Sequence, residues 1–136
     1  MIAIICVDNR CGMMFNRRRV SRDKNVYADI SELIGDKTLY MAEYSRSLFS
    51  SCRVSTIVSD DFLNLVGKWD FCFVEDRHLA EYSDKISGMV IYRWNRDYPS
   101  DFGLDVAPLE LGLHRTLVTE IVGSSHDKIT KEIYVR

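Results

Sequence analysis

The sequence predicts a single α/β domain in which a mostly parallel central sheet ends in an antiparallel hairpin. Short apolar runs of strand type alternate with segments of helical periodicity, which is the order of a parallel sheet with crossover helices. The first run, residues 2–7, has no polar alternation and is therefore expected to be buried on both faces. Two alternating runs near the C-terminus, joined by a polar connector, predict the hairpin.

The individual elements follow in order along the chain. Apolar residues from Val26 to Ile34 recur at helical spacing, with Ser21 or Asp23 as the N-cap and Gly35 as the terminator. Shorter helical segments are expected up to Phe49 and within 60–68 and 75–86. Further strands are expected at 38–42, 54–59, 70–74 and 88–94, and the hairpin strands at 115–122 and 129–135.

Composition limits the possible functions. The 136 residues suit one domain, 1–136, and the formal charge of −2 gives no overall attraction to nucleic acid or to an anionic membrane. The four cysteines contain no C-x-x-C pair, and with three scattered histidines they predict no metal site. The apolar run 2–7 is too short for a signal peptide or a membrane span, so we expect a cytoplasmic protein with no membrane partner. The oligomeric state stays open.

The order of elements resembles the dihydrofolate reductase family over nearly the whole chain. Residues 2–16, "IAIICVDNRCGMMFN", resemble that family's opening strand and mobile active-site loop, and 35–49, "GDKTLYMAEYSRSLF", resembles its "GKTVIMGRKTFESI". Asp101 falls where the family has the Gly-Asp of its long loop, and 120–136 resembles its terminal hairpin. The resemblance implies a dihydrofolate reductase-like fold with a ligand cleft.

The cofactor positions of that family are changed in this chain. Where the family holds the NADPH phosphate with Gly-Arg or Gly-Lys before a Thr, this chain has Ala42, Glu43, Tyr44 and Ser45. Where the family has Gly-Gly near the pyrophosphate, it has Glu75-Asp76, which the sequence places at a helix start. Carboxylates at both places disfavour a dinucleotide. We therefore expect that the protein has no cofactor. NADPH could bind only in a pose that differs from the family's.

The substrate positions match the family only in part, because the family's Leu-Pro-Trp before the first long helix is Arg-Val-Ser here. Asp23 lies close to the carboxylate that anchors the pteridine in the family, and Tyr27, one helical turn later, is expected to face the cleft with it. Arg53, by its spacing before "TIV", matches the arginine for the substrate's glutamate tail. The resemblance thus makes Asp23 the candidate catalytic residue.

The connector 12–23, "GMMFNRRRVSRD", carries four arginines and follows the first strand. Together with Lys24 and the connectors near 93–101 and 123–128, it gives eight Lys or Arg against four Asp, which predicts a local anion site. The other interpretation is that these arginines pair with Asp97, Asp101 and Asp127 and lock the loops. The candidate ligand-binding residues are Asn16, Arg17, Arg18, Arg19, Arg22, Arg53, Arg93, Asn95, Arg96, Ser125 and His126.

Three local patterns have simpler explanations. Tyr92 and Trp94 share one strand face and are expected in the core rather than in base stacking. Ser125, His126 and Asp127 are sequence neighbours that point apart, so they predict a polar loop rather than a catalytic triad. Met13, Met14 and Phe15 are expected to form an apolar plug over the cleft.

The leading functional hypothesis is a divergent dihydrofolate reductase-like protein without NADPH-dependent folate reduction, which binds a small anionic ligand near the arginine-rich connector. An active NADPH-dependent reductase that uses Asp23 is one alternative. An RNA-binding or RNA-processing protein is another, so nucleic acid stays open as a partner. A purely structural or interaction domain is the third.

Overall fold

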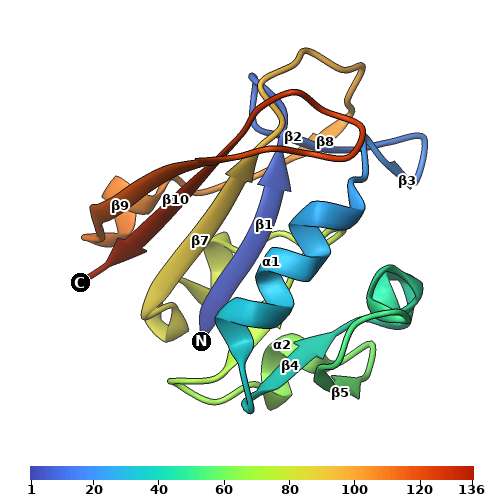
Figure 1. Cartoon of the computed structure of the whole chain (residues 1–136). Coiled ribbons are helices and arrows are strands. Elements are labelled where there is room, and N and C mark those ends of the chain that lie inside the picture. The colour runs from blue at the N-terminus through green and yellow to red at the C-terminus, as the bar shows by residue number, and fades with distance from the viewer.

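The computed structural model describes all 136 residues and contains a seven-stranded sheet in the order β5-β4-β6-β1-β7-β10-β9 (Figure 1). The pairs among β1, β4, β5, β6 and β7 are parallel, whereas β10 is antiparallel to both β7 and β9. This confirms the predicted fold class and the terminal hairpin. The strands of this sheet are β1 (Ile2–Val7), β4 (Thr38–Met41), β5 (Ser55–Val58), β6 (Phe71–Phe73), β7 (Gly88–Arg93), β9 (His114–Ile121) and β10 (Ile129–Val135).

Strand β1 lies in the middle of the sheet, between β6 and β7. Ala3, Ile4 and Ile5 are fully buried, as expected for a strand without polar alternation. Tyr92 and Trp94, on and just after β7, are buried as well, which confirms their predicted place in the core.

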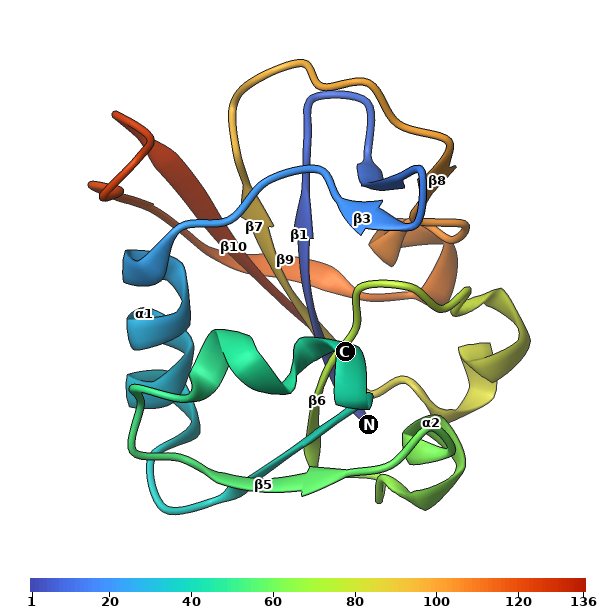
Figure 2. The same ribbon diagram turned by 90° about the vertical axis from the view of Figure 1, so that its right-hand side faces the viewer.

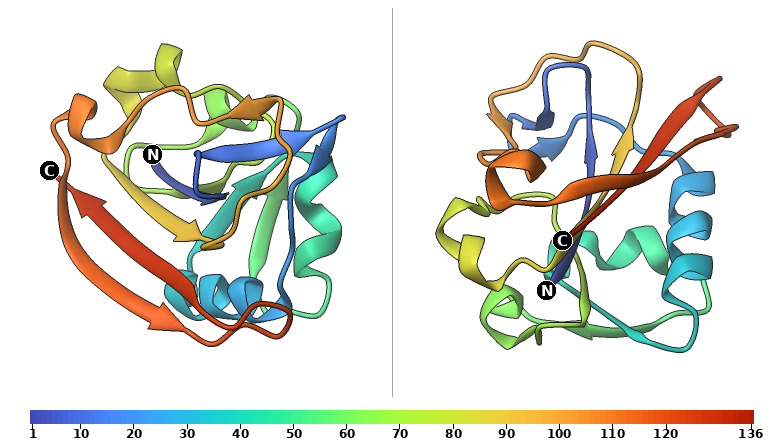
Figure 3. Two further views of the ribbon diagram at one scale, coloured as in Figure 1. Left: turned by 90° about the horizontal axis from the view of Figure 1, so that it is seen from above. Right: turned by 90° about the vertical axis from the view of Figure 1, so that its left-hand side faces the viewer.

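Helices cover both faces of the sheet (Figures 2 and 3). On one face, α1 (Lys24–Ile34) and the 3-10 helix η1 (Glu43–Phe49) bury aromatic and aliphatic side chains against the strands. Helix α1 begins at the N-cap Asp23 and ends at Gly35, whose φ of 61° suits a residue without a Cβ. The other face carries α2 (Phe62–Leu65) and the 3-10 helices η2 (Ala80–Lys85) and η3 (Pro108–Leu111).

The arginine-rich connector is a small sheet rather than a loop. Strands β2 (Gly12–Phe15) and β3 (Arg18–Arg19) form a hairpin, and β8 (Phe102–Gly103) adds to β2. Asn16 and Arg17 form the turn with φ of 52° and 63°, the signs that a two-residue hairpin turn requires. Met13 and Met14 of β2 are buried, but Phe15 is 42% exposed, which corrects its predicted place in the plug.

The short helix expected within residues 75–86 is present as the 3-10 helix η2 (Ala80–Lys85), but its start is not where the sequence placed it. Glu75 and Asp76 precede η2 by several residues. These two carboxylates therefore do not lie at a helix N-terminus.

Candidate functional site

Three connectors meet beyond the carboxyl ends of β1 and β7, where ligands lie in open α/β sheets. Ser21, Tyr98 and His126 come from three different connectors, and their side chains contact one another directly. Figure 1 shows the β9–β10 connector beside the segment that leads into α1. The cluster of connectors expected from the sequence is therefore present.

Asp23 binds the β9–β10 connector through both carboxylate oxygens. Oδ1 accepts hydrogen bonds from the amides of Asn25 and Ser124, and Oδ2 accepts one from the amide of Ser125 at 2.9 Å. Burial raises the pKa of Asp23, but the hydrogen bonds from Ser124, Ser125, His126 and Asn25 outweigh that effect and hold it far below its usual value. The carboxylate is thus ionised, and both of its oxygens accept hydrogen bonds from within the protein.

The position of Asp23 corrects the expectation that its side chain faces the cleft beside Tyr27. As the N-cap, Asp23 has an extended backbone (φ −156°, ψ 120°), so its side chain folds back on the first helical turn. Gly123 allows the close approach of the connector, because a Cβ there would collide with Asp23 Oδ2. Tyr27 alone of the pair lines the cleft.

His126 joins this carboxylate to two hydroxyl groups. Its Nδ1 lies 3.0 Å from Asp23 Oδ2, and its Nε2 lies 3.0 Å from both Ser21 Oγ and Tyr98 Oη. The ring stacks on Trp94 with 4.7 Å between centroids. The order carboxylate, Nδ1, Nε2, hydroxyl is that of a charge-relay triad.

Sequence reasoning rejected a triad of Ser125, His126 and Asp127 and did not foresee the triad-like order with Ser21 and Asp23. Its members are far apart in the chain, so no spacing signal marks them. However, the cavity that Ser21 lines has a volume of about 10 Å³, which is room for one water molecule at most. No acyl group fits beside this hydroxyl, so the network serves to hold the connectors together.

The cleft between β1, β6 and α1 is filled by an ion pair. Arg19 Nε donates to Glu75 Oε2 at 2.8 Å and Nη2 donates to Oε1 at 3.1 Å, a bidentate pair, while Ser45 Oγ donates to Oε1 at 2.8 Å. The guanidinium also lies over the Tyr44 ring, 4.4 Å from its centroid. We call Arg19, Glu75 and Ser45 the cleft clamp.

Little space remains beside the cleft clamp. Burial lowers the pKa of Arg19, but the hydrogen bonds and charge of Glu75 more than reverse that effect and raise it. Burial raises the pKa of the Cys6 thiol well above its usual value, so this sulfur is not a thiolate nucleophile. The residual cavity of about 10 Å³ is lined by Cys6, Met13, Arg19, Ser21, Tyr27, Val74, Glu75 and Trp94.

The predicted ligand-binding residues fall into two groups. One group is bound internally: Arg93 pairs with Glu132 at 2.7 Å, the Asn95 amide donates to Lys128 O and Thr130 Oγ1, and Ser125 Oγ donates to Arg22 O. Arg19 and His126 also belong to this group. The other group is exposed. It consists of Asn16, whose backbone amide donates to Asp101, and of the arginines that form no ion pair, namely Arg17, Arg18, Arg22, Arg53 and Arg96.

The alternative, in which the connector arginines form ion pairs with Asp97, Asp101 and Asp127, is wrong, because none of these pairs is present. Asp97 lies 4.0 Å from Arg10, Asp101 accepts from the amide of Asn16, and Asp127 forms no ion pair. The one ion pair made by an arginine of the connector is that of Arg19 with Glu75.

Two hollows flank the turn of the β2–β3 hairpin. The hollow on the Arg17 side, about 520 Å³, includes Asp76 and Asp101 and therefore offers no excess of positive charge. The hollow on the Arg18 side, about 500 Å³, contains no carboxylate. It is lined by Phe15, Asn16, Arg18, Arg19, Val20 and Pro99. Of the two, only the Arg18 hollow suits an anion.

No group of three His, Cys, Asp or Glu side chains is arranged to hold a metal ion. None of the helices combines the length and the apolar character needed to cross a bilayer.

Among the comparisons with known proteins, only the one with solved structures found a match. No protein-family model matches the chain, and no curated protein sequence matches it. A solved structure of dihydrofolate reductase from Enterococcus faecalis, complexed with NADP(H) and RAB-propyl, superposes with a TM-score of 0.67 at 13% sequence identity. The match covers 99% of this chain and 95% of that one. The chain therefore has a dihydrofolate reductase-like fold.

Proposed function

We propose that this protein is a dihydrofolate reductase-like domain that does not carry out NADPH-dependent folate reduction and that binds a small anion in the Arg18 hollow. The cleft clamp is the observation that carries the first part. Arg19 and Glu75 fill the cleft at the ends of β1 and β6 and leave about 10 Å³. Neither a nicotinamide nor a pteridine ring fits into that volume.

The charges around the cleft support the same conclusion. Glu75 is only 8% exposed, and its charge is balanced by Arg19. A ligand that displaced Arg19 would leave Glu75 as a buried carboxylate without a partner, which costs several kcal/mol. An anionic dinucleotide would also meet Glu43 at the start of η1. Both effects oppose NADPH.

The alternative of an active reductase needs Asp23 to be available to a substrate. Its carboxylate instead accepts hydrogen bonds from the β9–β10 connector and from Asn25, and it is fully buried. Releasing it would break the start of α1 and its contact with His126. This geometry supports a structural role for Asp23.

We expect the purified protein to show no NADPH oxidation with dihydrofolate and no heat of binding when NADPH is titrated by calorimetry. The physical reason is that the cleft is occupied by the protein's own ion pair. Tight binding of NADPH, or turnover that is lost in Asp23→Asn, would overturn the first part of the proposal.

The Arg18 hollow carries the second part. Arg18 is exposed and has no ion-pair partner, and no carboxylate lines the hollow. An oxyanion there would pair with the Arg18 guanidinium and reach the Asn16 side chain. Because the site is open to solvent, we expect weak binding that salt suppresses.

Pyrophosphate is the probe for this site. By NMR titration we expect a dissociation constant of roughly millimolar order, weakened about fivefold in Arg18→Gln. Lys37→Gln is the matched control, because Lys37 is exposed and lies just beyond the opposite end of α1. Equal binding by both variants would contradict the assignment, and tight RNA binding with a steep salt dependence would favour nucleic acid instead.

A further inference from the structure

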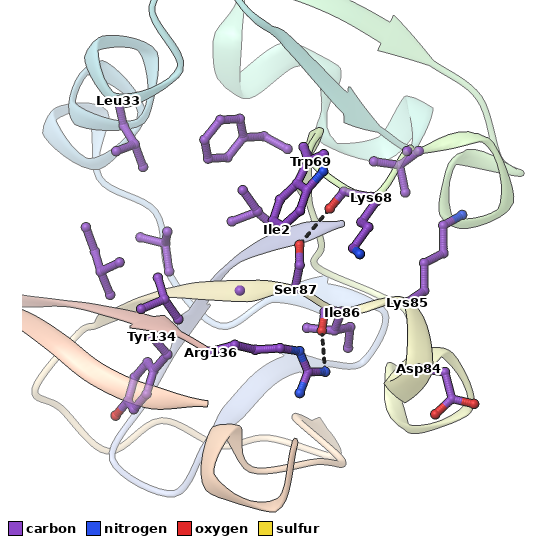
Figure 4. A pocket seen from close by; sticks show the side chains of 17 residues that line it. Ile2, Leu33, Lys68, Trp69, Asp84, Lys85, Ile86, Ser87, Tyr134 and Arg136 are labelled. Carbon is purple, nitrogen blue, oxygen red and sulfur yellow. Dashed lines mark hydrogen bonds between the residues drawn. The ribbon is translucent and has the colours of Figure 1, made fainter. Parts of the chain in front are cut away.

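A large groove lies at the opposite end of the sheet from the candidate site. It is formed where β1, β6 and β7 begin and has a volume of about 1020 Å³, within the range of pockets that hold small organic ligands (Figure 4). Ile2, Val90 and Ile133 come from three strands, Leu33 comes from the last turn of α1, and Trp69 comes from the segment before β6.

The groove exists because α1 is too short to cover this part of the sheet. The helix ends at Ile34 and the chain turns away at Gly35, so the apolar face beyond it has no covering helix. Ile2, Phe71 and Ile133 consequently stay partly exposed, and Trp69 is 64% exposed. A concave apolar surface of this kind is a candidate site for an apolar ligand body.

Basic side chains line the same groove. Lys68, Lys85 and Arg136 line it together with one carboxylate residue, Asp84. Lys85 Nζ donates to Leu63 O at 2.7 Å. The Arg136 guanidinium donates to Leu111 O and Ile86 O, and Figure 4 shows the second of these bonds. Lys68 lies over the Trp69 ring at 5.1 Å.

None of these three cations forms an ion pair, so their charges are solvated by carbonyl oxygens, an aromatic ring and water. The lining thus combines an apolar floor with an excess of positive charge. Carbonyl contacts hold Lys85 and Arg136 in place without neutralising them. A ligand with an acidic head group would supply the negative charge that complements these cations.

We propose that the groove binds a small amphipathic anion, with an alkyl or aromatic body on the sheet floor and an acidic head group toward Lys68 and Arg136. The site is separate from the cleft and from the Arg18 hollow, so it does not depend on the proposed function. The argument rests on the concave shape, the uncovered apolar strands and the unpaired cations.

Trp69 gives a direct readout of this site. The chain has two tryptophans, and the other, Trp94, is buried beside His126 at the far end of the sheet. Titration with dodecanoate is expected to shift the Trp69 emission to the blue, with a dissociation constant of roughly 10–100 µM. Calorimetry on Trp69→Phe checks binding without the fluorophore.

Head-group and body contributions are tested separately. Lys68→Glu is expected to weaken dodecanoate binding about fivefold and to leave dodecanol binding unchanged. Lys24→Glu is the charge control, because Lys24 is exposed at the opposite end of α1 from the groove. Leu33→Glu is expected to abolish binding of both. Leu109→Glu is the matched control, because Leu109 is 72% exposed on η3, outside the groove.

Three outcomes would overturn the proposal. The first is binding of dodecanol or dodecyltrimethylammonium as tightly as dodecanoate, which would remove the role of charge. The second is no binding of any probe to the folded wild type. The third is a monomer–dimer equilibrium by sedimentation that Leu33→Glu abolishes, because the occupant would then be a second copy of the chain.

Discussion

Replacing Arg19 with alanine is expected to lower the free energy of unfolding by about 3–5 kcal/mol, the cost of leaving a buried charge without its partner. Glu75 is 8% exposed and would keep only the hydrogen bond from Ser45. The Tyr44 ring would also lose the guanidinium that covers it. Urea unfolding followed by circular dichroism measures the change.

The neighbouring residue provides the control. Arg18 is exposed and unpaired, so Arg18→Ala is expected to change stability by no more than about 0.5 kcal/mol. Adding Glu75→Gln to the Arg19→Ala protein removes the buried charge and is expected to restore part of the loss. If Arg19→Ala and Arg18→Ala were equally stable, the cleft clamp would contribute nothing to folding.

The same variants test whether the ion pair keeps NADPH out of the cleft. The double variant Arg19→Ala with Glu75→Gln removes both the bulk and the charge of the ion pair. If NADPH then bound, the cleft clamp itself would be what excludes the cofactor from the wild type. If it still did not bind, removal of the ion pair would not be enough to admit the cofactor.

The fold was predictable because its signals are local. The apolar run of β1 and the helical spacing from Val26 to Ile34 each lie within one short, continuous segment of the sequence. The β2–β3 hairpin escaped prediction because β3 has only two residues and its turn uses Asn16-Arg17 instead of a glycine pair. Strand β8, which completes that sheet, is far away in the sequence.

The candidate site was predictable only in outline. The meeting of three connectors follows from the order of strands, because carboxyl ends of parallel strands share one edge of the sheet. The partner of Arg19 did not follow, because Glu75 lies 56 residues away on another strand end. Lys68, Lys85 and Arg136 are likewise separated in the chain, so no sequence pattern marks the groove that they line.

Replacing Asp23 with alanine is expected to cost about 3–5 kcal/mol, because it removes the N-cap of α1 together with buried hydrogen bonds to an ionised group. Ser124 and Ser125 would lose the acceptor for their amides, and His126 would lose its partner at 3.0 Å. Asp36→Ala is the control, since Asp36 is exposed and forms no ion pair.

The contribution of Asp23 is also expected to depend on pH. Hydrogen bonds from Ser124, Ser125, His126 and Asn25, acting against burial, depress the pKa of Asp23 in the folded state. The stabilisation is therefore complete above the usual carboxyl pKa of about 4 and is lost as the pH falls below it. Urea midpoints from pH 7 down to pH 2 should fall steeply in the wild type and in Asp36→Ala, and less steeply in Asp23→Ala. Parallel profiles for wild type and Asp23→Ala would mean that this carboxylate does not link α1 to the β9–β10 connector.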